Sequence, residues 1–174
     1  MTKDVTLTKI QYGDWGLDHA AWSVLKHMYP EANIPVFETS LDYSPYNDWT
    51  PKPLEYHYRL ASQLASLREN GILIIGSGNL VHNLSLLDYN IEAESHGWAV
   101  KFDKQVRKDL LSRNHQNLIN YVGLGPEALF AVPTLDHYLP MIYIIGLQKK
   151  KDNLKFIHEG FQNGSVSMRA FQIG

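Results

Sequence analysis

The sequence contains no cysteine and no long apolar run, and each absence excludes a class of protein. Without cysteine, the 174 residues cannot form a disulfide framework, a thiolate zinc site or a cysteine nucleophile. No apolar stretch approaches the length that crosses a bilayer, and the N-terminus lacks the apolar core of a secretion signal. These absences predict a cytoplasmic protein that has no membrane partner.

An excess of positive charge is also missing. The formal net charge is −2 and the isoelectric point is near 6.4, whereas a nucleic-acid surface needs clustered lysine and arginine. The one basic cluster, residues 149–151, is interpreted as a solvated loop. A chain of 174 residues is long enough for one domain with a sizeable core and too short for two. We therefore expect a single domain over residues 1–174 and no nucleic-acid partner.

An apolar run that meets a glycine-rich turn is the most informative stretch of the chain. Residues 72–75 are aliphatic and rich in isoleucine, which predicts a strand buried on both faces, and Gly76 and Gly78 are expected to end it. Four polar side chains follow where open α/β sheets bind their ligands: Ser77, Asn79, His82 and Asn83. The alternative is an ordinary turn in which the Ser and Asn side chains cap backbone groups.

The rest of the chain alternates between strand and helix patterns. Strands are predicted at residues 5–12, 34–40, 154–158 and 164–173. Helices are predicted at residues 17–28, 54–70, 98–111 and 134–146, and a long loop at 42–53. Asp18 is a candidate N-cap of the first helix, and Gly71 ends the second. Together these patterns predict an α/β fold of three layers, in which a central mixed sheet is flanked by helices.

Three histidines lie at turns or helix starts, where α/β folds place ligands: His19, His82 and His137. His19 falls in the first turn of its helix, where the dipole favours a neutral imidazole that can accept a proton. Asp136 and His137 are predicted to follow an N-cap at Thr134. Imidazole suits zinc and ferrous iron, so these residues allow a histidine-based metal site. They also allow His19 to be a surface residue, and Asp136 to complement a helix dipole with His137 packed beside it.

Five segments, in this order, carry a resemblance to a known family. They are GLDHAAW (16–22), MYPEANIPV (28–36), GSGNLVHNL (76–84), PTLDHYLP (133–140) and GSVSM (164–168). They resemble the 4,5-DOPA extradiol dioxygenase family, which belongs to the class III extradiol dioxygenases and is related to the protocatechuate 4,5-dioxygenase β-subunit. The resemblance implies an oxygen-dependent opening of a catechol ring at a non-haem site that holds Fe²⁺ or Zn²⁺.

The same resemblance implies a role for each of the three histidines. His82 and His137 correspond to residues of the metal site, and His19 corresponds to the acid/base histidine that takes a proton from the catechol. Two neighbours differ from the family pattern. Ala20 stands where the family usually has glycine, and Asp136 stands where glutamate is more frequent.

In the family that this chain resembles, a further βα segment with two more metal-binding histidines precedes the part that matches this chain. We therefore expect residues 1–174 to correspond to the C-terminal two-thirds of such a dioxygenase and to lack that first segment. Three hypotheses follow. The first is a ring-cleaving dioxygenase whose missing segment comes from a separate chain or has been lost. The second is a truncated remnant that binds or regulates rather than catalyses, and that covers its bare edge as a homo-oligomer. The third is a zinc-dependent hydrolase on the same scaffold.

Overall fold

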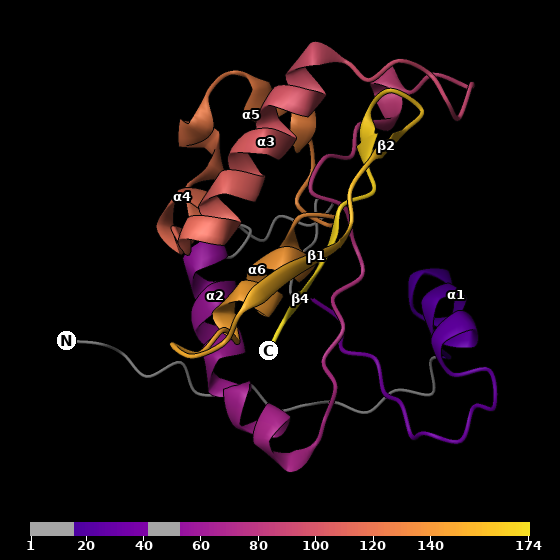
Figure 1. Cartoon of the computed structure of the whole chain (residues 1–174), viewed down its shortest axis with the longest axis vertical. Helices are drawn as coiled ribbons and strands as arrows, with labels where there is room; N and C mark the ends of the chain where they lie inside the picture. The colour runs from indigo at the N-terminus through magenta and orange to yellow at the C-terminus, as the bar shows by residue number, and fades with distance from the viewer. Residues whose placement is uncertain (1–15, 42–52) are drawn as a thin grey trace, which may run out of the picture. The chain divides into compact units, whose positions relative to one another are not determined.

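The computed structural model describes residues 16–41 and 53–174, which belong to two compact units (Figure 1). One unit lies within residues 1–42 and the other within residues 43–174. The predicted strand at 5–12 lies outside the described residues, as does most of the predicted loop at 42–53. The expectation of a single domain over the whole chain stays a prediction.

The first unit is built on helix α1 (His19–Met28). The Asp18 carboxylate accepts a hydrogen bond from the backbone N–H of Ala21 at 2.8 Å, which confirms the predicted N-cap. At the other end, the N–H of Tyr29 donates to the Leu25 carbonyl at 2.7 Å, and the chain then leaves the helix. Capping at both ends therefore defines α1 as the sequence predicts.

The predictions of strands at residues 34–40 and 72–75 are wrong, and for the same reason. Both segments are irregular and solvent-exposed, with Phe37 74% exposed and Leu73 61% exposed. An apolar, β-branched run favours an extended backbone, but a strand also needs a neighbour that pairs with its N–H and carbonyl groups. Among the described strands, none pairs with either segment.

The second unit begins with helix α2 (Leu54–Gln63), which continues as the 3-10 helix η1 (Ala65–Asn70). Gly71 follows with a φ of 75°, a left-handed conformation that glycine adopts without a steric cost. The predicted helix over residues 54–70 with a terminal glycine is therefore confirmed, with its last part wound as a 3-10 helix.

Helix α2 packs closely against α6 (Leu139–Gly146), as Figure 1 shows. A Cβ atom on Gly146 would lie 2.7 Å from the carbonyl oxygen of Tyr58 and 2.8 Å from the Cβ atom of Ala61. Glycine at this position therefore lets the two helices approach. Helix α6 is apolar along its whole length, and it lies in the core of this unit.

Four further helices form a layer beside this pair. They are α3 (Gly97–Ser112), α4 (His115–Ile119), η3 (Tyr121–Leu124) and α5 (Glu127–Ala131), and Figure 1 shows α3 beside α5. Helix α3 confirms the helix predicted at residues 98–111. Tyr138 is fully buried in this core, and its hydroxyl donates to the Leu118 carbonyl at 3.0 Å. A short 3-10 turn, η2 (Leu84–Leu86), precedes the layer.

The described strands form two small antiparallel sheets. Strand β1 (Leu154–His158) pairs with β4 (Ala170–Ile173), and β2 (Phe161–Gln162) pairs with β3 (Val166–Ser167). Strand β1 confirms its prediction, whereas the strand predicted at residues 164–173 divides into β3 and β4. The fold therefore combines helices with small sheets, and the expected three layers around a central mixed sheet stay a prediction.

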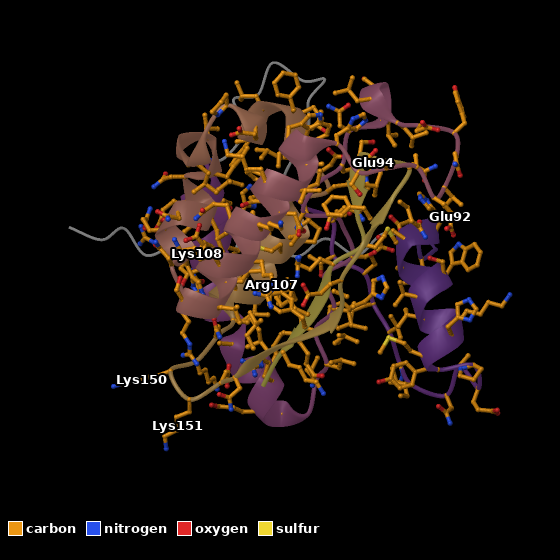
Figure 2. The ribbon with its side chains drawn as sticks, turned by 45° about the horizontal axis from the view of Figure 1, so that its top comes forward. Glu92, Glu94, Arg107, Lys108, Lys150 and Lys151 are labelled. Atoms are coloured by element: carbon orange, nitrogen blue, oxygen red, sulfur yellow. The ribbon has the colours of Figure 1, made fainter. Side chains whose placement is uncertain are left out.

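Charged side chains cover the turn between α6 and β1. Lys149 forms an ion pair with Glu69, while Figure 2 shows Lys150 and Lys151 extending away from the ribbon. Both are exposed, so the predicted solvated loop at residues 149–151 is confirmed. Within residues 16–41 and 53–174, no helix is both long and apolar enough to cross a membrane.

Candidate functional site

Two of the three predicted histidines lie side by side. The rings of His82 and His137 are stacked, with 3.5 Å between their centroids and 17° between their planes. The backbone of His82 is held from two sides, because its N–H donates to the Ala131 carbonyl at 2.9 Å and it forms a β-bridge with Val166. The fold therefore brings together two imidazoles that are separated by more than fifty residues of sequence.

Glycines allow the segment before His82 to reach the segment that carries His137. A Cβ atom on Gly78 would lie 2.3 Å from the carbonyl oxygen of His137, closer than real atoms approach. A Cβ atom on Gly76 would lie 2.9 Å from the carbonyl oxygen of Pro140. The two glycines were expected to end a strand, but their role in the structure is this close backbone contact.

His137 precedes a helix and is not part of its first turn, contrary to the prediction. Helix α6 begins at Leu139, five residues after the predicted N-cap at Thr134, and Tyr138 occupies the N-cap position. Pro140 explains the later start, because proline is favoured in the first turn of a helix, where its missing N–H costs nothing. The His137 ring therefore projects from a turn at the N-terminal edge of a buried helix.

The asparagines of the same segment divide between the two predicted roles. Asn83 caps backbone groups, since its side-chain oxygen accepts from the N–H of Leu86 at 3.2 Å and its amide donates to the Phe130 carbonyl at 2.8 Å. The side-chain oxygen of Asn79 lies 3.2 Å from Nδ1 of His137, and its amide nitrogen lies 2.9 Å from the Ser167 carbonyl. Asn83 is thus structural, whereas Asn79 contacts the histidine pair.

The surroundings of His82 favour a neutral imidazole. Burial lowers the pKa of His82, and the neighbouring His137 ring acts in the same direction, while the Asp136 carboxylate opposes both. Asp136 Oδ2 lies 3.7 Å from His137 Nε2, beyond hydrogen-bond distance, so the two pair only when His137 is protonated. Neutral imidazole is the form that binds a metal ion.

The histidine pair fits a metal site by ligand type but supplies only part of a ligand set. Imidazole nitrogen is a preferred ligand of Zn²⁺ and of non-haem Fe²⁺. Catalytic zinc sites use three protein ligands, and in the part of the chain that the structure describes no group of three or more His, Cys, Asp or Glu side chains could hold a metal ion. Further ligands would have to come from elsewhere.

His19 belongs to the first unit, whereas His82 and His137 belong to the second. His19 is the exposed first residue of α1. The expectation that the three histidines converge therefore stays a prediction.

Comparison with known proteins identifies relatives over nearly the whole chain. A family described as the catalytic LigB subunit of aromatic ring-opening dioxygenase matches residues 1–170. A protein named 4,5-DOPA dioxygenase extradiol from Escherichia coli K12 is 36% identical over 163 residues, which are 92% of this chain and 57% of that protein. A protein of the same name from Mirabilis jalapa is 34% identical over 151 residues, which are 87% of this chain and 54% of that protein.

A solved structure is also similar to this chain over most of its length. The crystal structure of an uncharacterized protein from Escherichia coli K12 matches with a TM-score of 0.84 and 34% sequence identity. The match covers 95% of this chain and 66% of that one. The chain spans about half the length of the curated relatives that it matches.

Proposed function

The chain belongs to the LigB family of aromatic ring-opening dioxygenases, and on that premise we propose that it takes part in the extradiol cleavage of a catechol. In this reaction dioxygen opens the ring beside one of the two hydroxyl groups. DOPA-like catechols are the proposed substrates, because the named relatives are 4,5-DOPA extradiol dioxygenases. The structural observation that carries this proposal is the stacked pair of His82 and His137, with 3.5 Å between the ring centroids.

We assign the two paired histidines to a non-haem metal site that takes Fe²⁺ or Zn²⁺. His82 is held by its backbone and has a lowered pKa, so it presents a neutral nitrogen. The His137 side chain is 36% exposed, which leaves it accessible to an ion from solvent. A bound ferrous ion would supply the redox chemistry by which dioxygen reacts with the catechol. The remaining ligands would come from a separate chain.

We assign to His19 the transfer of a proton from a catechol hydroxyl. The support is the match of residues 16–22 to the family pattern and the position of His19 at the start of α1. An imidazole that accepts this proton makes the catechol a better electron donor to oxygen. The methyl group of Ala20, where the family usually has glycine, would narrow the space beside this histidine.

A second candidate function is supported by the small number of ligands. Because the described residues offer two histidines and no third ligand, the chain could serve as a binding or assembly protein that does not retain metal. This alternative predicts association that depends on protein concentration, as a homo-oligomer, and no appreciable metal affinity. A stable monomer that retains metal would exclude it.

The proposed activity is tested by mixing the protein, reconstituted with Fe²⁺ under anaerobic conditions, with DOPA or caffeate and then admitting oxygen. We expect a yellow ring-opened product and the uptake of oxygen in proportion to the catechol consumed. The same protein without iron is the control and should stay colourless. A colourless mixture from protein that holds a stoichiometric amount of iron would contradict the proposal.

A further inference from the structure

We propose that Asn79 is a positioning residue that holds His137 in the tautomer protonated on Nδ1 and so directs the lone pair of Nε2 toward the metal site. The inference rests on the proposed function only in treating His137 as a metal ligand. The other steps rest on the hydrogen bonds around Asn79, which determine the tautomer of the His137 ring in the absence of any metal.

The orientation of the Asn79 amide follows from its partner on β3. One end of the amide lies 2.9 Å from the backbone carbonyl of Ser167, and a carbonyl oxygen can only accept a hydrogen bond. That end must therefore be the NH₂ group. The other end, which is the oxygen, then faces Nδ1 of His137 at 3.2 Å. No other assignment of the amide satisfies the Ser167 carbonyl.

The amide orientation in turn determines the tautomer of the ring. An amide oxygen can only accept, so Nδ1 of His137 must carry the hydrogen in this contact. A neutral imidazole has one protonated nitrogen, which leaves Nε2 with its lone pair. The only carboxylate described near Nε2, that of Asp136, lies 3.7 Å away and is too distant to hold a proton there by a hydrogen bond.

Asn79 is anchored firmly enough to impose this geometry. Its backbone N–H donates to the carbonyl of His137 at 3.0 Å, so Asn79 contacts this residue through both backbone and side chain. Ser167 is buried, and its hydroxyl donates to Asp103 Oδ1 at 2.7 Å. Asp103 is in turn bound by Arg169, whose Nε donates at 3.0 Å. The Asn79 side chain that contacts His137 is therefore tied to a buried hydrogen-bond network.

The tautomer can be read directly by long-range ¹H–¹⁵N correlation spectra of the metal-free protein. The spectra are recorded at about pH 8.5, some 2 units above the ordinary histidine pKa of about 6.5. We expect His137 to carry its proton on Nδ1 in the unaltered protein, because the Asn79 oxygen accepts from it. Asn79→Ala is expected to shift His137 toward the Nε2-protonated form and to weaken Zn²⁺ binding by about 10–100-fold.

Asn117→Ala is the matched control. Asn117 is also half-buried and lies on helix α4, whereas neither histidine is part of a helix, and its amide donates to Asp109 Oδ1 at 3.1 Å. A purely structural role for Asn79 predicts that both alanine variants lose stability alike and that neither changes the His137 tautomer. We expect the tautomer and the Zn²⁺ affinity to change in Asn79→Ala alone.

Three results would overturn the inference. They are an Nε2-protonated His137 in the unaltered protein, an unchanged tautomer in Asn79→Ala, and an equal loss of Zn²⁺ affinity in Asn117→Ala. The unaltered protein decides the first, so the test does not depend on whether a variant folds. Failure of the proposed function looks different: the tautomer changes as expected, but the unaltered protein binds no Zn²⁺.

Discussion

Replacing His19 by alanine is expected to lower catechol turnover by about 10²–10⁴-fold while leaving the metal content per chain unchanged. The range is that of a positioned general acid or base, which is the role that we propose for this imidazole. His19 is exposed on α1, and the helix keeps its Asp18 cap in the variant, so the stability of the fold is expected to be unchanged. Turnover is measured by oxygen uptake with the iron-reconstituted protein.

The matched control for His19 is His27→Ala. His27 is an exposed histidine in the last turn of the same helix, and no role in the reaction is proposed for it. We expect its replacement to leave turnover unchanged. Equal turnover in the two variants would show that His19 has no part in proton transfer.

The second large effect concerns stability. Arg169→Ala is expected to lower the free energy of unfolding by about 3–5 kcal/mol, because it leaves the buried Asp103 carboxylate without its cation. The two side chains are only 6% and 3% exposed. Arg169 Nε lies 3.0 Å from Asp103 Oδ1, and Nη2 lies 2.5 Å from Oδ2, so the pair is bidentate. Urea denaturation measures the loss.

Two comparisons separate the buried charge from other effects of Arg169→Ala. Lys150→Ala removes an exposed cation that Figure 2 shows extending from the surface, and it should leave the unfolding midpoint unchanged. Replacing Asp103 and Arg169 together by leucine and methionine should recover part of the loss, since no buried carboxylate is left unpaired. A double variant less stable than Arg169→Ala would show that packing, and not charge, explains the result.

Helices that depend on local signals were predictable from the sequence. The apolar stripe of residues 54–70 and the glycine that follows it specify α2, η1 and the left-handed Gly71. Asp18 caps α1 through a hydrogen bond to a residue three positions away. The start of α6 is also indicated by the sequence, because Pro140 is a signal of a first helical turn. Thr134 is a good N-cap residue too, however, and it favours an earlier start than the structure has.

Strands were harder to predict because their partners are distant in sequence. Residues 72–75 have the composition of a buried strand, yet Leu73 is 61% exposed, since burial and pairing depend on which segments lie beside it. Strand β1 was predictable in extent, but its pairing with β4 could not be read from either segment alone. An apolar run thus indicates the backbone conformation that a segment favours and leaves its neighbours open.

The sequence singles out the candidate residues of the site but does not indicate the contacts between them. His82, His137 and Asn79 all stand in motifs that the sequence singles out. The hydrogen bond from Asn79 to Ser167 joins residues 88 positions apart, and no local pattern indicates it. The sequence shows the glycines at 76 and 78, but the close backbone contact that requires them depends on the position of the segment at residues 137–140.

The proposed metal site is tested most directly by elemental analysis of the protein after anaerobic reconstitution with Fe²⁺ and removal of unbound ion. We expect about one metal ion per chain, lost in the His82→Ala, His137→Ala double variant. The double variant His27→Ala, His158→Ala, which removes two exposed histidines, should retain the metal. No retained metal in the unaltered protein, or full retention after loss of His82 and His137, would contradict the assignment.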